Sequence, residues 1–368
     1  MRKFYFLLLL TSMALASQTG FGQFRVYSNE FLNIGAGARG LGMGSAQAAS
    51  VSDGTATYWN PAALVNVQDY PQLNLMHAEY FAGIGKYDFG SLALPVSGGK
   101  RTIGLSILRF AVDDIPNTVF LVEPDGSLNF SNITTFSSAD YAFMFSLAQK
   151  VLDEEDRKLS MGFNAKVIHR KAGDFATAWG FGFDAAIRYA SKKWNIGIVA
   201  RDVTTTFNAW SFNINEPMRE VFYITKNEIP VKSTELTAPR LIAGGAYTFR
   251  LSNSFSLLAE ADLDVTFDGR RNTVLSFKPV SLDPKLGLEA SVKKVFFVRA
   301  GINNFQKALD DTDTTNRKKL WIYQPSIGAG FNISNVRIDY AFTNLANQSN
   351  PLYTHIFSIK LDLKKKQN

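Results

Sequence analysis

Cysteine is absent from this 368-residue sequence, and histidine occurs only three times. Without cysteine there is no disulfide scaffold, thiolate metal site or cysteine nucleophile, and three histidines leave little for a histidine-based site. No metal or cofactor is expected. No stretch reaches 18 consecutive apolar residues, so the sequence predicts no transmembrane helix. What the chain has in abundance is phenylalanine and glycine, with 30 and 27 residues.

Charge and hydropathy exclude two further classes of protein. Hydrophobic residues make up 46% of the chain and charged residues 19%, so it is not disordered. The net charge of +7 is spread along the sequence without clusters of basic and aromatic residues, which argues against nucleic-acid binding. Either one large core or two ordinary domains is compatible with this length.

The first 22 residues are typical of a secretory signal peptide. Arg2 and Lys3 precede an apolar run at 4–16, which is too short to span a bilayer. Cleavage after Ala16 or after Gly22 remains open. Removal of residues 1–22 takes away two positive charges and no negative ones, so the net charge of +7 becomes +5. The mature chain is either a soluble exported protein or an outer-membrane barrel.

From about residue 70 the hydropathy alternates with a period of two, which indicates β-strands. In 178–191, for example, the apolar residues Trp179, Phe181 and Phe183 alternate with small or charged ones. Strands are expected at 70–82, 86–97, 101–112, 137–151, 157–171, 178–191, 193–205, 237–250, 253–266, 282–294, 295–305, 320–333, 335–345 and 353–364.

The connections between these 14 strands sort by length. Every second connection is short, and the others include the long segments 113–136, 206–236, 267–281, 306–319 and 346–352. Outer-membrane barrels have short periplasmic turns and longer external loops. The sequence therefore predicts an all-β fold, a 14-stranded antiparallel transmembrane barrel over 70–364 with both termini periplasmic and the long loops extracellular. A short basic tail follows at 365–368.

Residues 23–69 precede the first strand and are rich in glycine, alanine and serine. Gly35, Gly37 and Gly40 form a G-x-G-x-x-G pattern, but no strand–helix unit or acidic partner accompanies it, so no dinucleotide site is predicted. A 14-stranded barrel is too wide to fill with its own side chains. We expect this segment to plug the lumen as a hatch whose motif comprises Gly35, Gly37, Arg39, Gly40, Gly42, Gly44, Asp53, Trp59, Asn60, Pro61 and Ala62.

Inward-facing polar side chains of the strands are the expected partners of that hatch. They are Asp184, Arg188, Glu260, Asp262, Asp264, Arg337 and Asp339. Each lies on the polar face of an alternating strand.

The stretch 31–64 resembles the N-terminal hatch of the FadL-like outer-membrane barrels, in which Asn60, Pro61 and Ala62 match an Asn-Pro-Ala motif. Within that superfamily, 31–64 and 335–363 are most similar to the PorV/PorQ group of the Bacteroidetes type IX secretion system. The resemblance implies 14 strands, no enzymatic activity, a place in the outer membrane among lipid and lipopolysaccharide, and binding of translocon, attachment complex or cargo C-terminal domains. One departure is the end of the chain, which is Leu363 and a basic tail where many barrels end on an aromatic residue.

Three functions remain open. The first is a protein-docking platform whose partner-binding loop, 206–236, carries Phe207, Trp210, Phe212, Met218, Phe222 and Tyr223. The second is transport of hydrophobic small molecules, as in FadL-type barrels, with Pro95 as a possible weak point in the wall. The third, lipid hydrolysis, would need a serine and an acid beside His77, His169 or His355, and no motif surrounds these histidines. Cargo, oligomeric state and the choice between main shuttle and paralogue stay undetermined.

Overall fold

The computed structural model describes residues 28–230, 233–309, 319–343 and 353–364. The signal peptide predicted at 1–22, the tail at 365–368, parts of the predicted loops 206–236 and 306–319, and all of the predicted loop 346–352 lie outside these residues. The strands are β1 (Gln72–Tyr80), β2 (Gly85–Val96), β3 (Arg101–Asn117), β4 (Thr134–Asp153), β5 (Arg157–Ala172), β6 (Ala176–Ser191), β7 (Trp194–Arg201), β8 (Thr206–Phe212), β9 (Ser233–Thr237), β10 (Arg240–Arg250), β11 (Phe255–Thr266), β12 (Leu275–Ser276), β13 (Ser281–Val292), β14 (Phe296–Leu309), β15 (Lys319–Ile333), β16 (Val336–Thr343) and β17 (Thr354–Asp362).

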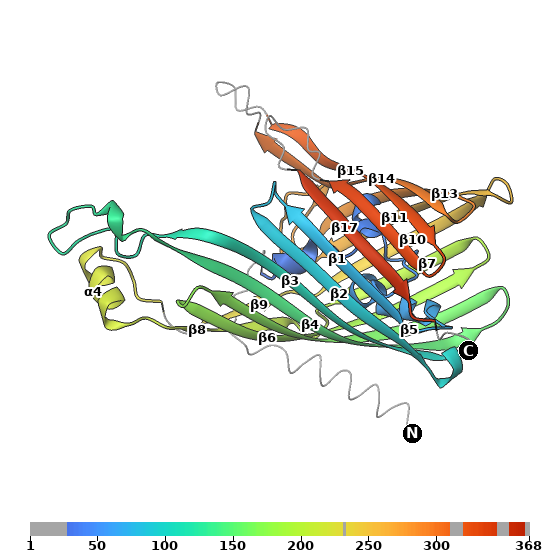
Figure 1. Cartoon of the computed structure of the whole chain (residues 1–368), viewed down its shortest axis with the longest axis horizontal. Helices are drawn as coiled ribbons and strands as arrows, with labels where there is room; N and C mark the ends of the chain where they lie inside the picture. The colour runs from blue at the N-terminus through green and yellow to red at the C-terminus, as the bar shows by residue number, and fades with distance from the viewer. Residues whose placement is uncertain (1–27, 231–232, 310–318, 344–352, 365–368) are drawn as a thin grey trace.

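These strands form one closed antiparallel barrel (Figure 1). Strands β7 and β8 follow each other along one position in the ring, and so do β9 and β10. The pairings show this, since β7 pairs with β10 and β8 pairs with β9. The two-residue β12 is a short addition beside β13. Without it, the strands form 14 continuous strand positions around the ring, which we call staves. The ring closes where β1 pairs with β17, from Gln72↔Asp362 to Glu79↔His355. The predicted 14-stranded antiparallel barrel is confirmed.

The barrel is apolar outside and polar inside, which reverses the pattern of a soluble protein. On β6, Trp179 and Phe181 are 52% and 46% exposed, whereas Asp184 and Arg188 are 4% and 8% exposed. Exposed apolar side chains recur on the outward positions of the other staves. In the described part of the chain no helix is long and apolar enough to cross a membrane.

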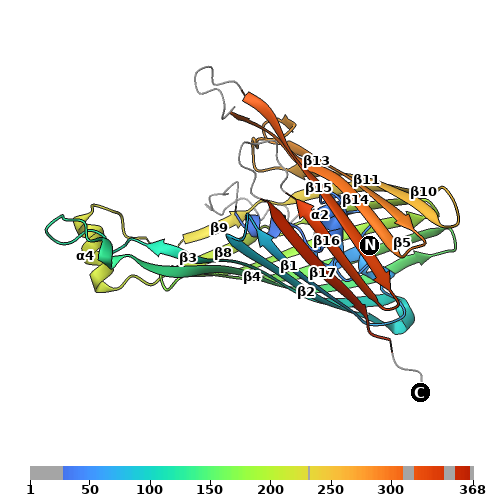
Figure 2. The same cartoon turned by 45° about the horizontal axis from the view of Figure 1, so that its top comes forward.

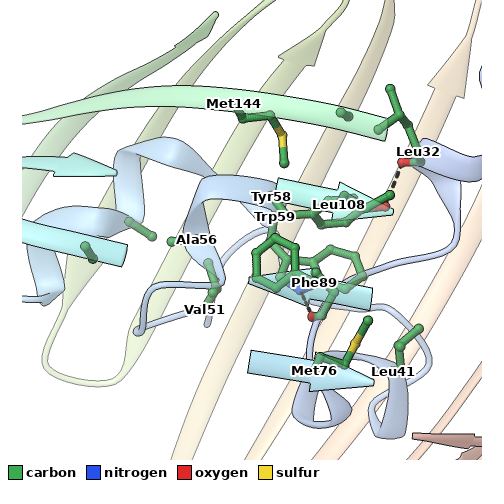
Figure 3. Close-up of a cluster of buried hydrophobic side chains, with 14 of the residues drawn as sticks. Leu32, Leu41, Val51, Ala56, Tyr58, Trp59, Met76, Phe89, Leu108 and Met144 are labelled. Carbon is green, nitrogen blue, oxygen red and sulfur yellow. Dashed lines mark hydrogen bonds between the residues drawn. The ribbon is translucent and has the colours of Figure 1, made fainter. Parts of the chain in front are cut away.

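Residues 28–67 lie within the ring of strands (Figures 1 and 2). They fold into short helical turns, η2 (Glu30–Asn33), α2 (Ala38–Gly42), α3 (Ala56–Trp59) and η3 (Pro61–Asn66). Figure 3 shows the apolar cluster that these turns form with the wall. Tyr58 and Trp59 pack edge to face at 4.8 Å between ring centres, next to Phe89, Leu108 and Met144 of the strands. We call residues 28–67 the lumen segment.

One end of the barrel extends into an arm. Strands β3 and β4 run past the neighbouring staves to the connection 118–133, which contains η5 (Phe130–Asn132). Strands β8 and β9 flank α4 (Glu216–Ile224), and both views place α4 beside the β3–β4 tip, far from the barrel (Figures 1 and 2). We use the name arm for 113–137 and 206–230.

The predicted partner loop, 206–236, is shorter in the structure than expected, because its first residues form a strand. Phe207, Trp210 and Phe212 lie on β8, where 206–212 pair with β6. Their side chains alternate between the two faces of the wall. Phe207 faces outward and is 39% exposed, whereas Trp210 faces inward, where its ring lies under the guanidinium of Arg170. Only Met218, Phe222 and Tyr223 remain on the connecting element, in α4.

Closure of the ring predicts that a proline on a closing strand destabilises the barrel. Phe357 is outward-facing on β17, between His77 and Tyr340, so Phe357→Pro removes one N–H from the ladder without touching the interior. We expect a loss of about 1–3 kcal/mol in the free energy of unfolding, because a backbone carbonyl loses its donor. Phe130→Pro is the control, since it replaces the first residue of η5 in the arm. Equal unfolding midpoints in urea for the two variants would contradict the prediction.

Candidate functional site: the barrel lumen and its mouth

Two carboxylates of β11 bind the backbone of the lumen segment. Asp262 accepts hydrogen bonds from the amides of Gln47 and Ala48 at 2.8 and 2.9 Å. Glu260 accepts from the amides of Ala49 and Ser50 at 2.7 and 3.2 Å. Backbone N–H groups in a buried turn need acceptors. Alternation on β11 places both carboxylates inward, where they supply four acceptor contacts to one turn.

A cluster of charges ties helix α2 to the strands that follow β11 around the wall. Glu289 on β13 accepts two hydrogen bonds from the Arg39 guanidinium, at 2.9 and 3.1 Å, and one from Arg299 Nε at 2.6 Å. Arg299 also lies 2.8 Å from Asp339, which pairs with Arg337 at 3.1 Å. Three arginines and two carboxylates thus join α2, β13, β14 and β16. Such paired and bidentate contacts are what buried charges require.

A second set of charges joins strands to one another. Lys166 lies 2.7 Å from Asp184 and also contacts Asp202. Asp264 lies 3.1 Å from Arg240 and 3.4 Å from Lys285. These ion pairs link neighbouring strands of the inner wall and do not involve the lumen segment.

All seven polar residues expected to face inward do so, but they have different partners. Arg188, Glu260 and Asp262 hydrogen-bond the lumen segment, with Arg188 donating to the Ala49 carbonyl at 3.1 Å. The others pair with strand residues; these are Asp184, Asp264, Arg337 and Asp339. Sequence reasoning missed Glu289, Arg299 and Lys166, although the same alternation places them on inward faces.

The Asn-Pro-Ala triplet forms a cap inside the lumen. The Asn60 side chain accepts from the Ala62 amide at 3.0 Å and donates to the Ala48 carbonyl at 2.6 Å, so one residue starts η3 and holds the neighbouring turn. Pro61 occupies the first position of η3, where proline is well tolerated. Asp53 accepts from the Thr55 amide at 2.9 Å and stabilises the turn before α3.

The glycines of the G-x-G-x-x-G pattern make room for an indole ring. A Cβ on Gly35 or Gly40 would lie 3.0 or 2.8 Å from ring atoms of Trp59, whose Nε1 donates to the Ala36 carbonyl at 2.7 Å. Gly37 adopts a φ of 81°. The pattern therefore serves packing within the segment.

Backbone also meets backbone across the lumen. Gly42 lies against Gly328 and Ala341, and Gly44 lies against the backbone of Ile302. On the wall, a Cβ added to Gly301 would lie 2.0 Å from the Gly44 nitrogen. Small residues on both sides let the segment touch the strands directly, which leaves little free space at this depth.

A cavity of about 640 Å³ opens above the lumen segment, at the end of the barrel that carries the longer connections. One side is apolar and includes Phe31, Ile34 and Leu41 of the segment with Tyr87 and Phe110 of the wall. The other side is charged and polar. Its ionisable lining residues are Arg170, Arg240, Arg271 and Lys285, against Glu30, Asp140, Asp264 and Asp283. Four cations and four anions give this mouth cavity no formal net charge.

The wall is continuous where β17, β1, β2 and β3 pair, whereas the pairing of β14 with β15 shifts register between Asn303 and Gln306, which line the cavity. Strand β2 pairs with β3 from Gly85↔Val112 to Val96↔Arg101, and Pro95 lies within this register opposite Thr102. Strand β1 pairs with both β2 and β17 along its length. The pairings of β1, β2 and β17 thus run through the seam without a register shift, so Pro95 does not open the wall.

The histidines lie on strands rather than in one site. His77 contacts Asp88 at 2.7 Å, His355 contacts the Tyr340 hydroxyl at 2.8 Å, and His169 packs on Trp179. Among the described residues, no group of three or more histidines and carboxylates could hold a metal ion. No hydrogen bond joins any of these histidines to a described serine.

Comparisons with known proteins bear on the fold. No protein-family model matches the chain, and no curated protein matches it. Among solved structures, the CymD monoaromatic hydrocarbon channel is similar with a TM-score of 0.54 at 14% identity, over 93% of this chain and 100% of that one. The toluene transporter TbuX of Ralstonia pickettii gives 0.52 at 12%, over 89% and 98%. The toluene transporter TodX of P. putida gives 0.52 at 10%, over 90% and 99%. The shared feature is the FadL-like barrel fold.

Neutralising Glu289 is predicted to destabilise the lumen. In Glu289→Gln the charges of Arg39 and Arg299 lose the carboxylate between them, and we expect a cost of about 3–5 kcal/mol in the free energy of unfolding. The control is Glu154→Gln, which removes an exposed ion pair with Arg157 and should cost less than about 1 kcal/mol. Urea unfolding in micelles measures both, and a control as destabilised as Glu289→Gln would contradict the role given to the cluster.

Proposed function

We propose that the chain is a bacterial outer-membrane barrel that admits hydrophobic small molecules through the mouth cavity. The observation that carries the proposal is this cavity of about 640 Å³, with one apolar side, directly above the lumen segment. The exposed apolar outer face supports a membrane location, because such side chains favour hydrocarbon over water. Three solved structures of the same fold are named as channels or transporters of toluene or monoaromatic hydrocarbons.

The cavity favours a neutral ligand over an anion. Arg170 is held by Asp140 at 2.9 Å, Arg271 by Asp268 at 2.6 Å, and Arg240 by Asp264 at 3.1 Å. A carboxylate ligand would have to compete with these acids. An apolar molecule instead gains about 25 cal/mol for each Å² of apolar surface that leaves water against the apolar side.

Passage beyond the cavity requires the lumen segment to move. Its residues Ala36, Ala46 and Ala63 are fully buried, and the pairings of β1 with β2 and of β2 with β3 beside the cavity show no register shift. The segment therefore acts as a hatch in this proposal, and its Asn-Pro-Ala cap and the Glu289 cluster stabilise the closed position. On this view the long connections face the cell exterior and both termini the periplasm.

The absence of native cysteine allows a direct test by an engineered disulfide. A Cβ built on Gly42 of α2 lies 3.5 Å from the Ala341 Cβ on β16, which is within the range of disulfides. We expect the oxidised Gly42→Cys, Ala341→Cys double variant to lose uptake of radiolabelled toluene by cells that have no channel of their own. Reduction should restore uptake, because only the tether prevents movement.

Each single cysteine variant serves as a matched control and should transport in both redox states. Mass spectrometry of the purified double variant verifies the disulfide. Undiminished toluene uptake with the disulfide formed would contradict movement of the segment, and absence of toluene uptake by the parent protein would contradict the transport proposal.

A docking role is a second candidate, and the arm is the observation that favours it. Phe130, Leu128 and Tyr223 are 68%, 59% and 85% exposed at its end. Exposed aromatic residues on protruding segments are typical of binding surfaces. The PorV/PorQ resemblance suggests translocon, attachment-complex or cargo C-terminal domains as partners. It rests on the motifs of the sequence.

Docking through the arm predicts separable phenotypes. In Phe130→Ser, Tyr223→Ser we expect at least a tenfold weaker capture of a cargo C-terminal domain, because buried aromatic anchors often contribute 2 kcal/mol or more. Toluene uptake should not change, since both side chains lie outside the cavity. Phe277→Ser, which alters an exposed aromatic residue in the connection 267–280, is the control. Unchanged capture in pull-downs from detergent extracts would remove the arm as the partner surface.

A further inference from the structure

The outer face of the barrel is hollowed over four adjacent staves, β10, β11, β13 and β14. Outward positions here are occupied by small residues, whereas β6 presents Trp179, Phe181 and Phe183 at such positions. The hollow measures about 530 Å³. Its floor consists of Gly245, Ala259, Ala261 and Ala300, and its sides of Trp194, Tyr247, Leu286, Leu288 and Ile302. We call it the outer groove.

Gly245 is the clearest sign that the groove is open. A Cβ built on this residue meets no atom within 4 Å, although its neighbours Ile196 and Ala261 flank it in the ladder. Its φ lies outside the left-handed range, so no backbone requirement explains the glycine. The groove is therefore open to an apolar group from outside the described chain.

Basic residues gather in the short turns β6–β7, β10–β11 and β13–β14, at one end of these staves. They are Lys193, Arg250, Lys293 and Lys294, all exposed. None of the four forms an ion pair with a residue that the structure describes, in contrast to Lys192, which lies 2.6 Å from Asp156. Leu286 is separated from Lys293 by seven positions along β13, so groove and turns are on the order of 15–25 Å apart.

We propose that the outer groove and these turns bind one anionic phospholipid, with an acyl chain in the groove and the phosphate among the four basic side chains. The proposal rests on the membrane location given above. Trp194 and Tyr247 lie between the two parts, at the level where amphipathic rings favour the membrane interface. The distance matches an extended acyl chain, and the uncompensated positive charge matches a phosphate.

Charge also favours lipid over a second copy of the chain. A two-fold contact across the groove would bring two identical surfaces together. Both sets of four cations would then approach each other, and no described acid forms an ion pair with any of the four. A free phosphate ion would contact only the basic side chains and leave the apolar groove empty.

Native mass spectrometry of the full chain, released from vesicles of phosphatidylglycerol and phosphatidylethanolamine, tests the proposal. The parent protein should retain one phosphatidylglycerol. Gly245→Leu fills the groove and should abolish this retention. Lys293→Asn, Lys294→Gly removes two charges while suiting the φ values of 51° and 56° at this turn. Retention of phosphatidylglycerol by this variant should fall by at least about fivefold, which is the effect expected from the loss of one cation near a membrane surface.

Two matched controls separate the site from general effects. Gly90→Leu enlarges another outward glycine, whose Cβ would lie 3.6 Å from Ile107 and Leu75. Lys100→Gln, Arg101→Gln neutralises a different short turn. Both controls should retain phosphatidylglycerol like the parent protein.

The outcomes are distinct. Equal retention in Gly245→Leu and Gly90→Leu, equal retention of both phospholipids, or a dimer that Gly245→Leu dissociates would each overturn the lipid site. Failure of the parent protein to insert into vesicles, seen as loss of its heat-modifiable mobility on gels, would instead overturn the membrane location. Insertion with site-independent lipid binding leaves the membrane location standing and rejects the lipid site alone.

Discussion

A ring of strands in hydrocarbon tolerates no unpaired backbone group, and the pairing of β1 with β17 meets that constraint. Once the ring is closed, strand pleating sends successive side chains to opposite sides. The outside accepts Trp179 and Phe181, and the inside receives Asp184 and Arg188. The reversed arrangement of polar and apolar residues thus follows from closure, and so does the need to satisfy many charges within a narrow space.

The lumen segment and the inner wall satisfy each other. Without 28–67, the carboxylates of Glu260 and Asp262 would lose four backbone donors, and Glu289 would lose Arg39. Without the wall, the turn at 47–50 would lose its acceptors. Glycines such as Gly301 on the wall allow this close approach. Any movement of the lumen segment would have to exchange these contacts for others with water or with a ligand, which sets the free-energy cost of such a movement.

Alternation made the barrel predictable, because it depends only on which side each residue faces. All 14 staves were found this way, and so were the seven inward residues. Pairing was not predictable: Asp264 bonds Arg240, which is near in sequence, whereas Glu289 bonds Arg39, 250 residues away, and register across the ring decides between such partners. The break at 202–205 also hid β8, so Phe207 was assigned to a loop although it alternates with Thr206 and Asn208. The PorV/PorQ resemblance rests on short motifs without a matching family model.

The contacts of the lumen segment have a consequence for the order of assembly. Arg39 bonds a residue 250 positions later, Gln47 one 215 positions later, and Ala38 one 320 positions later. Contacts between such distant positions form slowly, because long loops must close first. The lumen segment is synthesised before the strands and is therefore the part of the chain that reaches its final contacts last. Until β11, β13 and β17 are in place, the contacts of Arg39, Gln47 and Ala38 with these strands cannot form, and this part of the segment stays exposed.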